Sequence, residues 1–244
     1  RIVDHTSDIL LPYTETSRRN LLREGIHPQK IFVTGSPIKE VYDSLEEKFL
    51  KTSVLKDLSL KKSKYFVASI HREENVDKPN GLKRIVDSFN LLADKFSLPV
   101  IVSTHPRTKI RLENEGLLSI SNPLINWHEP FGLLDFLNLQ KNSYCAISDS
   151  GTIHEDSSVL GFPAVAIRKS TEKAESIDAG HCIITGLIPD MVLKATIIAV
   201  ETKDSYENLP MPAEYSVSDV STKVIKIILG MNAVIKERVW GKDA

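Results

Sequence analysis

Residues 144–167 read YCAISDSGTIHEDSSVLGFPAVAI, and this stretch decides the fold class. The apolar run at 144–148 predicts a buried strand, and residues 152–160 predict a helix that Gly161 ends. A second apolar run at 163–167 predicts another strand. A strand, a helix and a strand in this order form a parallel crossover unit, which is almost always right-handed.

The same alternation continues on both sides of this unit. It predicts further strands at 65–70, 99–103, 124–125 and 182–185, and helices at 82–96, 107–115, 133–141 and 190–202. Such a series is typical of an α/β fold with an open, Rossmann-like parallel sheet and helices on both faces. Outside it, the sequence predicts helices at 15–24, 39–48 and 218–229 and a strand at 31–34.

Composition and charge exclude several classes of protein. The 244 residues include 31 basic and 32 acidic side chains, whereas a nucleic-acid-binding protein usually has a basic excess. No apolar run is long enough for a membrane span, and no secretory signal opens the chain. Cys145 and Cys182 stand in apolar segments and are expected to be buried free thiols. We therefore expect a cytoplasmic protein, and the first residue, Arg1, suggests that its natural N-terminus is missing.

Polar side chains follow four of the predicted strands. His71 and Arg72 follow the strand at 65–70, His105 follows the strand at 99–103, Ser150 and Thr152 follow the strand at 144–148, and Arg168 follows the strand at 163–167. Ligands of open parallel sheets bind at the carboxyl ends of the strands, so these groups are expected on one rim. A histidine after a strand is more often an ordinary loop residue, but His71 and His105 share a sheet edge, which favours a site.

Residues 148–155, SDSGTIHE, predict a cradle for a diphosphate. Gly151 lets the backbone approach a ligand closely, and the helix that follows aims free N–H groups at the same place. Ser150 and Thr152 add hydroxyl donors. The alternative is an ordinary helix cap. Glu155 and Asp156 could accept hydrogen bonds from ribose hydroxyls, or could be solvated acids of a first helical turn.

Several motifs together resemble the non-hydrolysing UDP-N-acetylglucosamine 2-epimerases. They are HREEN at 71–75, SDSG at 148–151, GFP at 161–163, YTE at 13–15, NLLREG at 20–25 and IFVTG at 31–35. The resemblance covers essentially the whole chain in order. It is strongest with the capsule and O-antigen branch, which includes UDP-N-acetyl-L-talosamine 2-epimerases.

This resemblance implies a GT-B protein with two Rossmann-like domains. Its N-terminal domain, with the carboxylates that act at C2 of the sugar, would be almost wholly absent from this chain. The implied organisation is the end of the N-terminal domain at 1–35, a connector at 36–64, the UDP-binding C-terminal domain at 65–217, and a final helix at 218–244 that crosses back to the N-terminal domain.

The resemblance also implies roles for single residues. His71 and Arg72 would be catalytic. The predicted UDP-binding residues are His105, Phe136, Ser150, Gly151, Thr152, Glu155, Asp156, Arg168 and Lys173. Phe136 stands where the family places an aromatic ring against uracil, although it could be a core residue. Lys173 stands where the family commonly has arginine, and lysine lacks the flat two-pronged guanidinium.

The implied activity interconverts UDP-N-acetylglucosamine and UDP-N-acetylmannosamine by eliminating and re-adding UDP, for surface polysaccharide precursors. No cofactor and no metal are expected. The expected partners are a UDP-sugar substrate and a second copy of the chain in a homodimer, without nucleic acid or membrane. Two other hypotheses remain open: a GT-B glycosyltransferase with a UDP-sugar donor, and a chain that only binds UDP.

Overall fold

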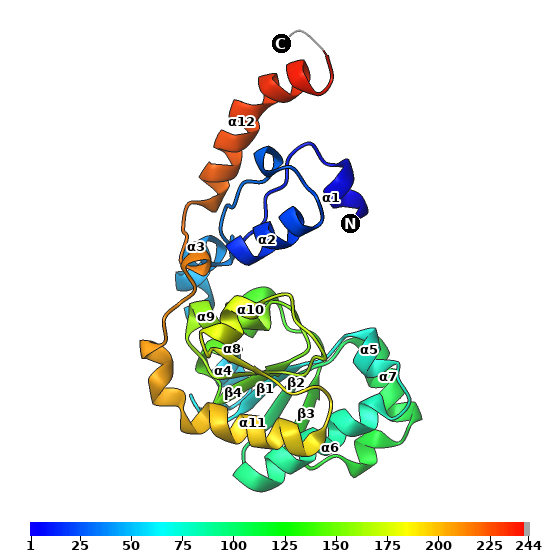
Figure 1. The fold of residues 1–244 in the computed structure, drawn as a ribbon. Helices are drawn as coiled ribbons and strands as arrows, with labels where there is room; N and C mark the ends of the chain where they lie inside the picture. Colours follow the sequence, from blue (N-terminus) through cyan, green and yellow to red (C-terminus); the bar gives the residue numbers. More distant parts are fainter. Residues whose placement is uncertain (242–244) are drawn as a thin grey trace. The chain divides into compact units, whose positions relative to one another are not determined.

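A computed structural model describes residues 1–241 and divides the chain into two compact units (Figure 1). Unit 1 comprises Arg1–Ser44 and the chain from Met211 onward, and unit 2 comprises Leu45–Pro210. Helix α3 (Ile38–Leu50) contributes residues to both units. Each unit is described separately below.

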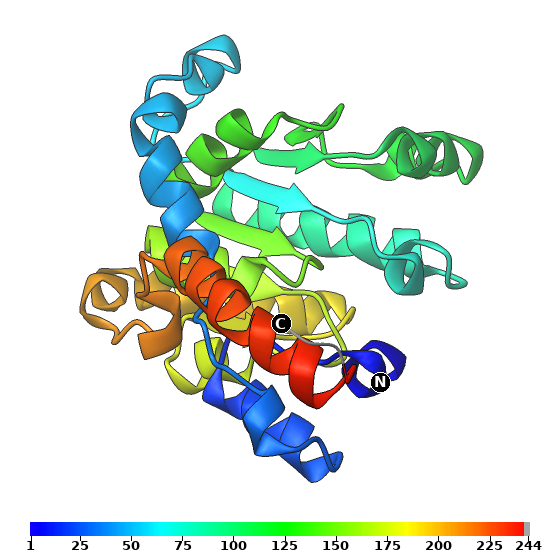
Figure 2. The ribbon, with the colours of Figure 1, turned by 90° about the horizontal axis from the view of Figure 1, so that it is seen from above.

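Unit 2 contains a six-stranded sheet in which every pair of neighbouring strands is parallel (Figure 2). The strands are β1 (Phe66–Ser69), β2 (Val100–Ser103), β3 (Ile125–His128), β4 (Cys145–Ser148), β5 (Ala164–Ala166) and β6 (Cys182–Ile184). Their order across the sheet is β3-β2-β1-β4-β5-β6. The chain therefore runs outward from the centre in one direction after β1 and in the other direction after β4.

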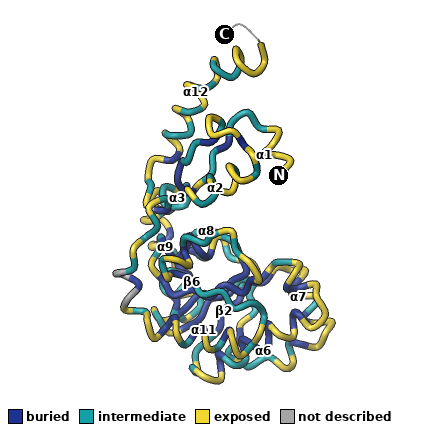
Figure 3. Tube along the Cα trace, viewed as in Figure 1, coloured by how far each residue is buried: buried dark blue, intermediate teal, exposed yellow. Residues whose placement is uncertain are grey.

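Both faces of the sheet are covered, and this explains the unbroken apolar strands. Side chains of a strand alternate between its faces. Phe66 and Ala68 enter one core cluster with residues of α6 and α11, whereas Val67 enters a second cluster with Leu139 of α8 and Ile153 of α9. Figure 3 shows the resulting band of buried residues through the sheet. The predicted fold class is confirmed.

The helices of unit 2 begin and end close to the predicted limits. They are α4 (Val54–Asp57), α5 (Glu73–Val76), α6 (Gly81–Phe96), α7 (Pro106–Asn114), α8 (Leu133–Asn142), α9 (Ile153–Leu160), α10 (Ala174–Asp178) and α11 (Pro189–Glu201), with short 3₁₀ turns at Leu117–Ile120 and Lys203–Asn208. Gly161 ends α9 with a left-handed φ of 69°, as its position in the sequence predicts. The short helices α4 and α5 had no periodic signal in the sequence.

Unit 1 is formed by segments from both ends of the chain. Its elements are α1 (Ile2–Thr6), α2 (Glu15–Arg23), the start of α3, α12 (Val220–Arg238), and 3₁₀ turns at Pro28–Lys30 and Ala213–Tyr215. Thr14 caps α2 as expected, because its hydroxyl accepts from the N–H of Ser17 at 3.2 Å. The two ends of the chain are held together by Glu40, whose carboxylate accepts from the N–H of Ser221 at 2.9 Å.

The strand predicted at 31–34 is reduced to one parallel bridge between Leu10 and Ile31. The N–H of Phe32 donates to Leu10 at 3.0 Å, and the N–H of Thr34 donates to Pro12 at 3.2 Å. Pro12 has no N–H to return a bond, so the ladder stops there.

Helix α12 is longer than predicted and runs to Arg238. It exposes several large apolar side chains, namely Ile225, Ile228 and Leu229. No helix within residues 1–241 has both the length and the apolar character needed to cross a bilayer.

Candidate functional site

The centre of the sheet, where β1 and β4 lie side by side, is the point at which the winding direction reverses. In open α/β sheets this switch point forms the ligand crevice. The register places Ser69 of β1 level with Ser103 of β2 and with Ser148 of β4. The loops that begin at Ile70, Thr104 and Asp149 therefore leave the same edge of the sheet.

Asp149 holds the loop after β1 in place. Its side chain is fully buried. The carboxylate accepts from the N–H of His71 at 3.1 Å, from the N–H of Arg72 at 2.9 Å and from Nδ2 of Asn75 at 3.1 Å. Asn75 Nδ2 also donates to the carbonyl of Ile167 at 3.0 Å, beyond β5. One carboxylate thus connects the ends of three neighbouring strands.

Asp149 was not among the predicted site residues, although it lies inside the SDSG motif. A carboxylate directly after an apolar strand was the available signal. Asp149 organises the site because it is buried, and the apolar pattern of a strand predicts burial only up to the last residue of that strand.

The predicted catalytic residue His71 lies at this junction. Its Nδ1 is 3.4 Å from Oδ1 of Asp149, and its side chain is 53% exposed. One edge of the ring therefore lies beside a buried carboxylate while much of its surface stays accessible.

The SDSG turn forms a compact hydroxyl and backbone cluster at the start of α9. The N–H of Ser150 donates to Oγ of Ser148 at 3.0 Å, and the N–H of Thr152 donates to Oγ of Ser150 at 3.3 Å. The Ser150 and Thr152 hydroxyls are 3.0 Å apart. The first N–H groups of a helix have no acceptor within the helix, so α9 presents donors beside these hydroxyls.

Two guanidinium groups approach Gly151. A Cβ placed on this glycine would lie 3.2 Å from Nη1 of Arg168 and 3.8 Å from Nη2 of Arg72. It would also lie 3.2 Å from Oε1 of Glu172. A side chain here would extend into the space that the two guanidinium groups approach, so glycine leaves that space open.

Arg168 is a buried cation with unused donors. The side chain is 5% exposed, and its Nη2 donates to Glu172 at 3.0 Å. Its Nε and Nη1 atoms are buried and have no hydrogen-bond partner within the described part of the chain. Leaving such donors unsatisfied costs roughly 1–3 kcal/mol or more, so the geometry favours an anionic ligand at this position.

Glu155 and Asp156 are both buried, which rules out solvated acids of a first helical turn. Oε2 of Glu155 lies 3.1 Å from Nζ of Lys173. Oδ2 of Asp156 accepts from the Thr152 hydroxyl at 3.2 Å and from Nε2 of Gln140 at 3.3 Å. The two carboxylates therefore have different partners.

His105 and Phe136 have structural partners. Nδ1 of His105 accepts from the N–H of Arg107 at 3.2 Å and so caps α7. With His71, it lines a cavity of about 260 Å³ beside α5 and α7. Phe136 is half-buried and packs against the core cluster that contains Ile153. Contact of either residue with UDP stays a prediction.

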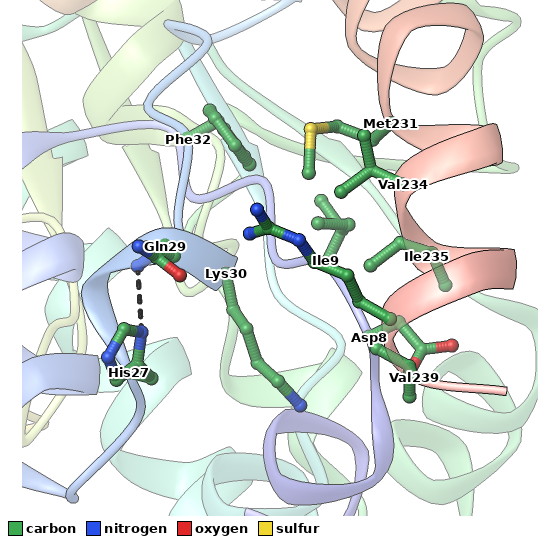
Figure 4. Close-up of a pocket in the computed structure, with 11 residues that line it drawn as sticks. Asp8, Ile9, His27, Gln29, Lys30, Phe32, Met231, Val234, Ile235 and Val239 are labelled. Atoms are coloured by element: carbon green, nitrogen blue, oxygen red, sulfur yellow. Dashed lines mark hydrogen bonds between the residues drawn. The ribbon is translucent and has the colours of Figure 1, made fainter. Parts of the chain in front are cut away.

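Unit 1 has its own cavity, of about 430 Å³, between the first 32 residues and α12 (Figure 4). Ile9, Phe32, Met231 and Val234 give it an apolar lining. All predicted site residues lie in unit 2, and none of them lines this cavity.

His154, inside the same α9 turn, predicts how stability depends on pH. It is fully buried, and Nε2 lies 3.2 Å from the Thr171 hydroxyl. Burial, reinforced by the charge of Arg168, lowers its pKa from 6.5 to about 4. Below about pH 6.5 the unfolded chain binds a proton here that the folded chain does not bind until about pH 4, so acid favours unfolding.

The variant His154→Gln should therefore lose less stability in acid. Between about pH 7.5 and pH 5, the wild-type free energy of unfolding should fall by about 2 kcal/mol more than that of the variant. Urea titrations followed by circular dichroism at both pH values measure this difference. Equal losses in the two proteins would show that His154 is not responsible.

The fold and the switch-point site define a Rossmann-like α/β domain of the GT-B type. The similar solved structures have the same architecture. The family model described as UDP-N-acetylglucosamine 2-epimerase matches residues 1–229. The chain belongs to this family.

Curated relatives and solved structures agree with this assignment. The chain is 35% identical over 218 residues to a UDP-N-acetylglucosamine 2-epimerase of Methanocaldococcus jannaschii, and 34% identical over 212 residues to one of Methanococcus maripaludis. Each match covers 85% of this chain and 58% of the relative.

The solved structure of UDP-N-acetylglucosamine 2-epimerase from Rickettsia bellii superposes with a TM-score of 0.90 at 35% identity, over 99% of this chain and 64% of that one. The M. jannaschii enzyme in complex with UDP-GlcNAc and UDP superposes with a TM-score of 0.85 at 32% identity, over 94% and 63%. The chain thus spans about three fifths of the length of these relatives.

Proposed function

We propose that this chain is the UDP-binding part of a UDP-N-acetylglucosamine 2-epimerase that makes precursors for surface polysaccharides. The observation that carries the proposal is the buried Arg168, whose unused donors face the Gly151 turn at the switch point of the sheet. The similar M. jannaschii protein was solved with UDP-GlcNAc and UDP, which supports a UDP-sugar as the ligand.

The proposed organisation adds an N-terminal domain that lies mostly outside this chain. Residues 1–35 and 218–244 would belong to that domain, and unit 1, which combines the two ends of the chain, supports this. The chain spans 58% of the curated relatives, which leaves room for most of a second Rossmann-like domain. The form with that domain complete is called the two-domain protein below.

The proposed reaction begins with loss of UDP, because the hydrogen at C2 is not acidic. A carboxylate of the N-terminal domain would take the C2 proton while the bond between C1 and the diphosphate oxygen breaks, which yields 2-acetamidoglucal and UDP. UDP then re-adds while a proton returns to the other face of C2. Negative charge grows on the leaving diphosphate. His71, Arg72, Arg168 and the N–H groups at the start of α9 would stabilise that charge, and the approach of Arg168 and Arg72 to Gly151 supports this.

Analysis of the products made by the two-domain protein without any acceptor tests this proposal. In D₂O with UDP-N-acetylglucosamine, NMR should show UDP-N-acetylmannosamine with deuterium at C2. A glycosyltransferase would leave the sugar unchanged until an acceptor is added. If the two-domain protein instead turns over only UDP-N-acetyl-L-talosamine, a 2,6-dideoxy sugar nucleotide, the result would favour a UDP-N-acetyl-L-talosamine 2-epimerase.

We also propose that Asp156 is the carboxylate that holds the ribose. Asp156 contacts Thr152, one helical turn back toward the diphosphate turn, and so lies in line with the cradle.

The two carboxylates can be separated with 2′-deoxy-UDP. The variant Asp156→Asn should reduce the preference of the chain for UDP over 2′-deoxy-UDP by roughly 10-fold, because it loses a charged acceptor. Glu155→Gln is the matched variant and should keep that preference. Calorimetric titrations with both nucleotides measure it, and the reverse pattern would assign the ribose to Glu155.

The finer expectations on assembly and location also stay proposals. We propose a homodimer that works in the cytoplasm, where free buried thiols such as Cys145 and Cys182 persist. Light scattering of the two-domain protein measures the oligomeric state, and a monomeric mass would contradict the homodimer.

A further inference from the structure

We infer that Asp149 is a positioning residue that fixes the orientation and the tautomer of the His71 imidazole. The role of this tautomer in turnover rests on the proposed function, whereas the tautomer itself can be observed without any activity.

The geometry separates Asp149 from any ligand. Its side chain is fully buried, so it cannot touch a substrate in the crevice. Its Oδ1 accepts from the N–H of His71 and lies 3.4 Å from Nδ1 of the same residue. Its Oδ2 accepts from the N–H of Arg72 and from Asn75. The same carboxylate therefore holds the backbone of His71 by hydrogen bonds and lies beside Nδ1 of its ring.

The chemistry of the contact determines which nitrogen faces the crevice. A carboxylate only accepts hydrogen bonds, so it favours a proton on Nδ1 of the ring. Nε2 is then directed away from Asp149. Nε2 becomes a donor when the ring carries a second proton. A donor of this kind suits the bridging oxygen of a departing diphosphate.

The alternative is that Asp149 only braces the loop through its backbone contacts. Asn75 distinguishes the two roles, because it takes part in the same brace and also bonds to Ile167, but has no contact with the His71 ring among the described hydrogen bonds.

Nitrogen-15 NMR of the histidine-labelled 244-residue chain tests the inference directly. The His71 signals are assigned by their loss in His71→Gln. In the neutral ring, Nδ1 should carry the proton and Nε2 should not. A neutral ring protonated on Nε2, the form that free imidazole side chains prefer, would overturn the inference whatever the chain binds.

Kinetics of the two-domain protein provide the second readout. Asp149→Asn should lower kcat roughly 30-fold and leave UDP affinity within about threefold of wild type. Asn75→Ala should lower kcat by no more than about threefold. In the His71→Ala background, Asp149→Asn should cause little further loss. An equal loss of kcat with and without His71 would show a structural brace only, and if Asp149→Asn fails to fold, the tautomer in the wild-type chain decides.

Discussion

The variant His71→Ala in the two-domain protein is expected to lower kcat/KM roughly 100-fold while UDP affinity changes by less than about threefold. Arg72 and Arg168 approach the Gly151 turn, the proposed diphosphate position, so one imidazole is expected to add little to the ground state. As UDP departs, charge concentrates on the bridging oxygen, and a donor aimed at that atom gains strength. Such an interaction affects kcat and kcat/KM together.

His128→Ala is the matched control for this prediction. His128 ends strand β3, which is separated from β1 by β2, at the same edge of the sheet, and nothing assigns it to the site. Melting temperature, UDP affinity and turnover are measured on the same preparation of each variant. If the folded His71→Ala protein retains turnover within about threefold of wild type, His71 is not catalytic.

The variant Arg168→Met is expected to weaken UDP binding roughly 100-fold without lowering the melting temperature of the ligand-free chain. Hydrogen bonds between a guanidinium and phosphate oxygens are among the strong ones, and their loss is felt fully at a buried position. In the ligand-free chain, Nε and Nη1 of Arg168 have no hydrogen-bond partner among residues 1–241, and Nη2 pairs with the exposed Glu172. Removing a poorly satisfied buried charge is often neutral or stabilising.

Weaker UDP binding with an unchanged melting temperature would show that Arg168 binds the ligand and does not stabilise the fold. Arg84→Met removes an exposed positive charge from α6 and should leave both UDP affinity and melting temperature nearly unchanged. Calorimetry and thermal denaturation on both variants give the comparison. A large fall in melting temperature with unchanged affinity in Arg168→Met would show that the arginine serves the fold alone.

The sheet could be predicted because its strands are buried on both faces. Runs such as FVAS at 66–69 and CAIS at 145–148 contain no polar interruption before their last residue, and each ends at a polar loop. The site followed from the same pattern, since the carboxyl ends of parallel strands meet at one edge. His71, Ser150, Gly151 and Arg168 lie at that edge as expected.

The contacts that organise the site could not be predicted in this way. Asp149 acts through three donors from a loop 74 to 78 residues earlier, and no local pattern encodes such a contact. Burial of Glu155 and Asp156 likewise depends on Lys173 and Gln140, which come from other elements. In unit 1, the extended run at 31–34 has the composition of a strand, but its pairing stops at Pro12, which has no N–H to donate.

Calorimetric titration of the 244-residue chain with UDP, followed by an epimerase assay on the same sample, tests the central claim most directly. The switch-point site predicts saturable binding of one UDP per chain, and the proposed location of the C2 carboxylates outside this chain predicts no UDP-N-acetylmannosamine. If UDP produces no saturable heat, or if the chain alone converts UDP-N-acetylglucosamine at an enzymatic rate, the assignment of this chain as the UDP-binding part is contradicted.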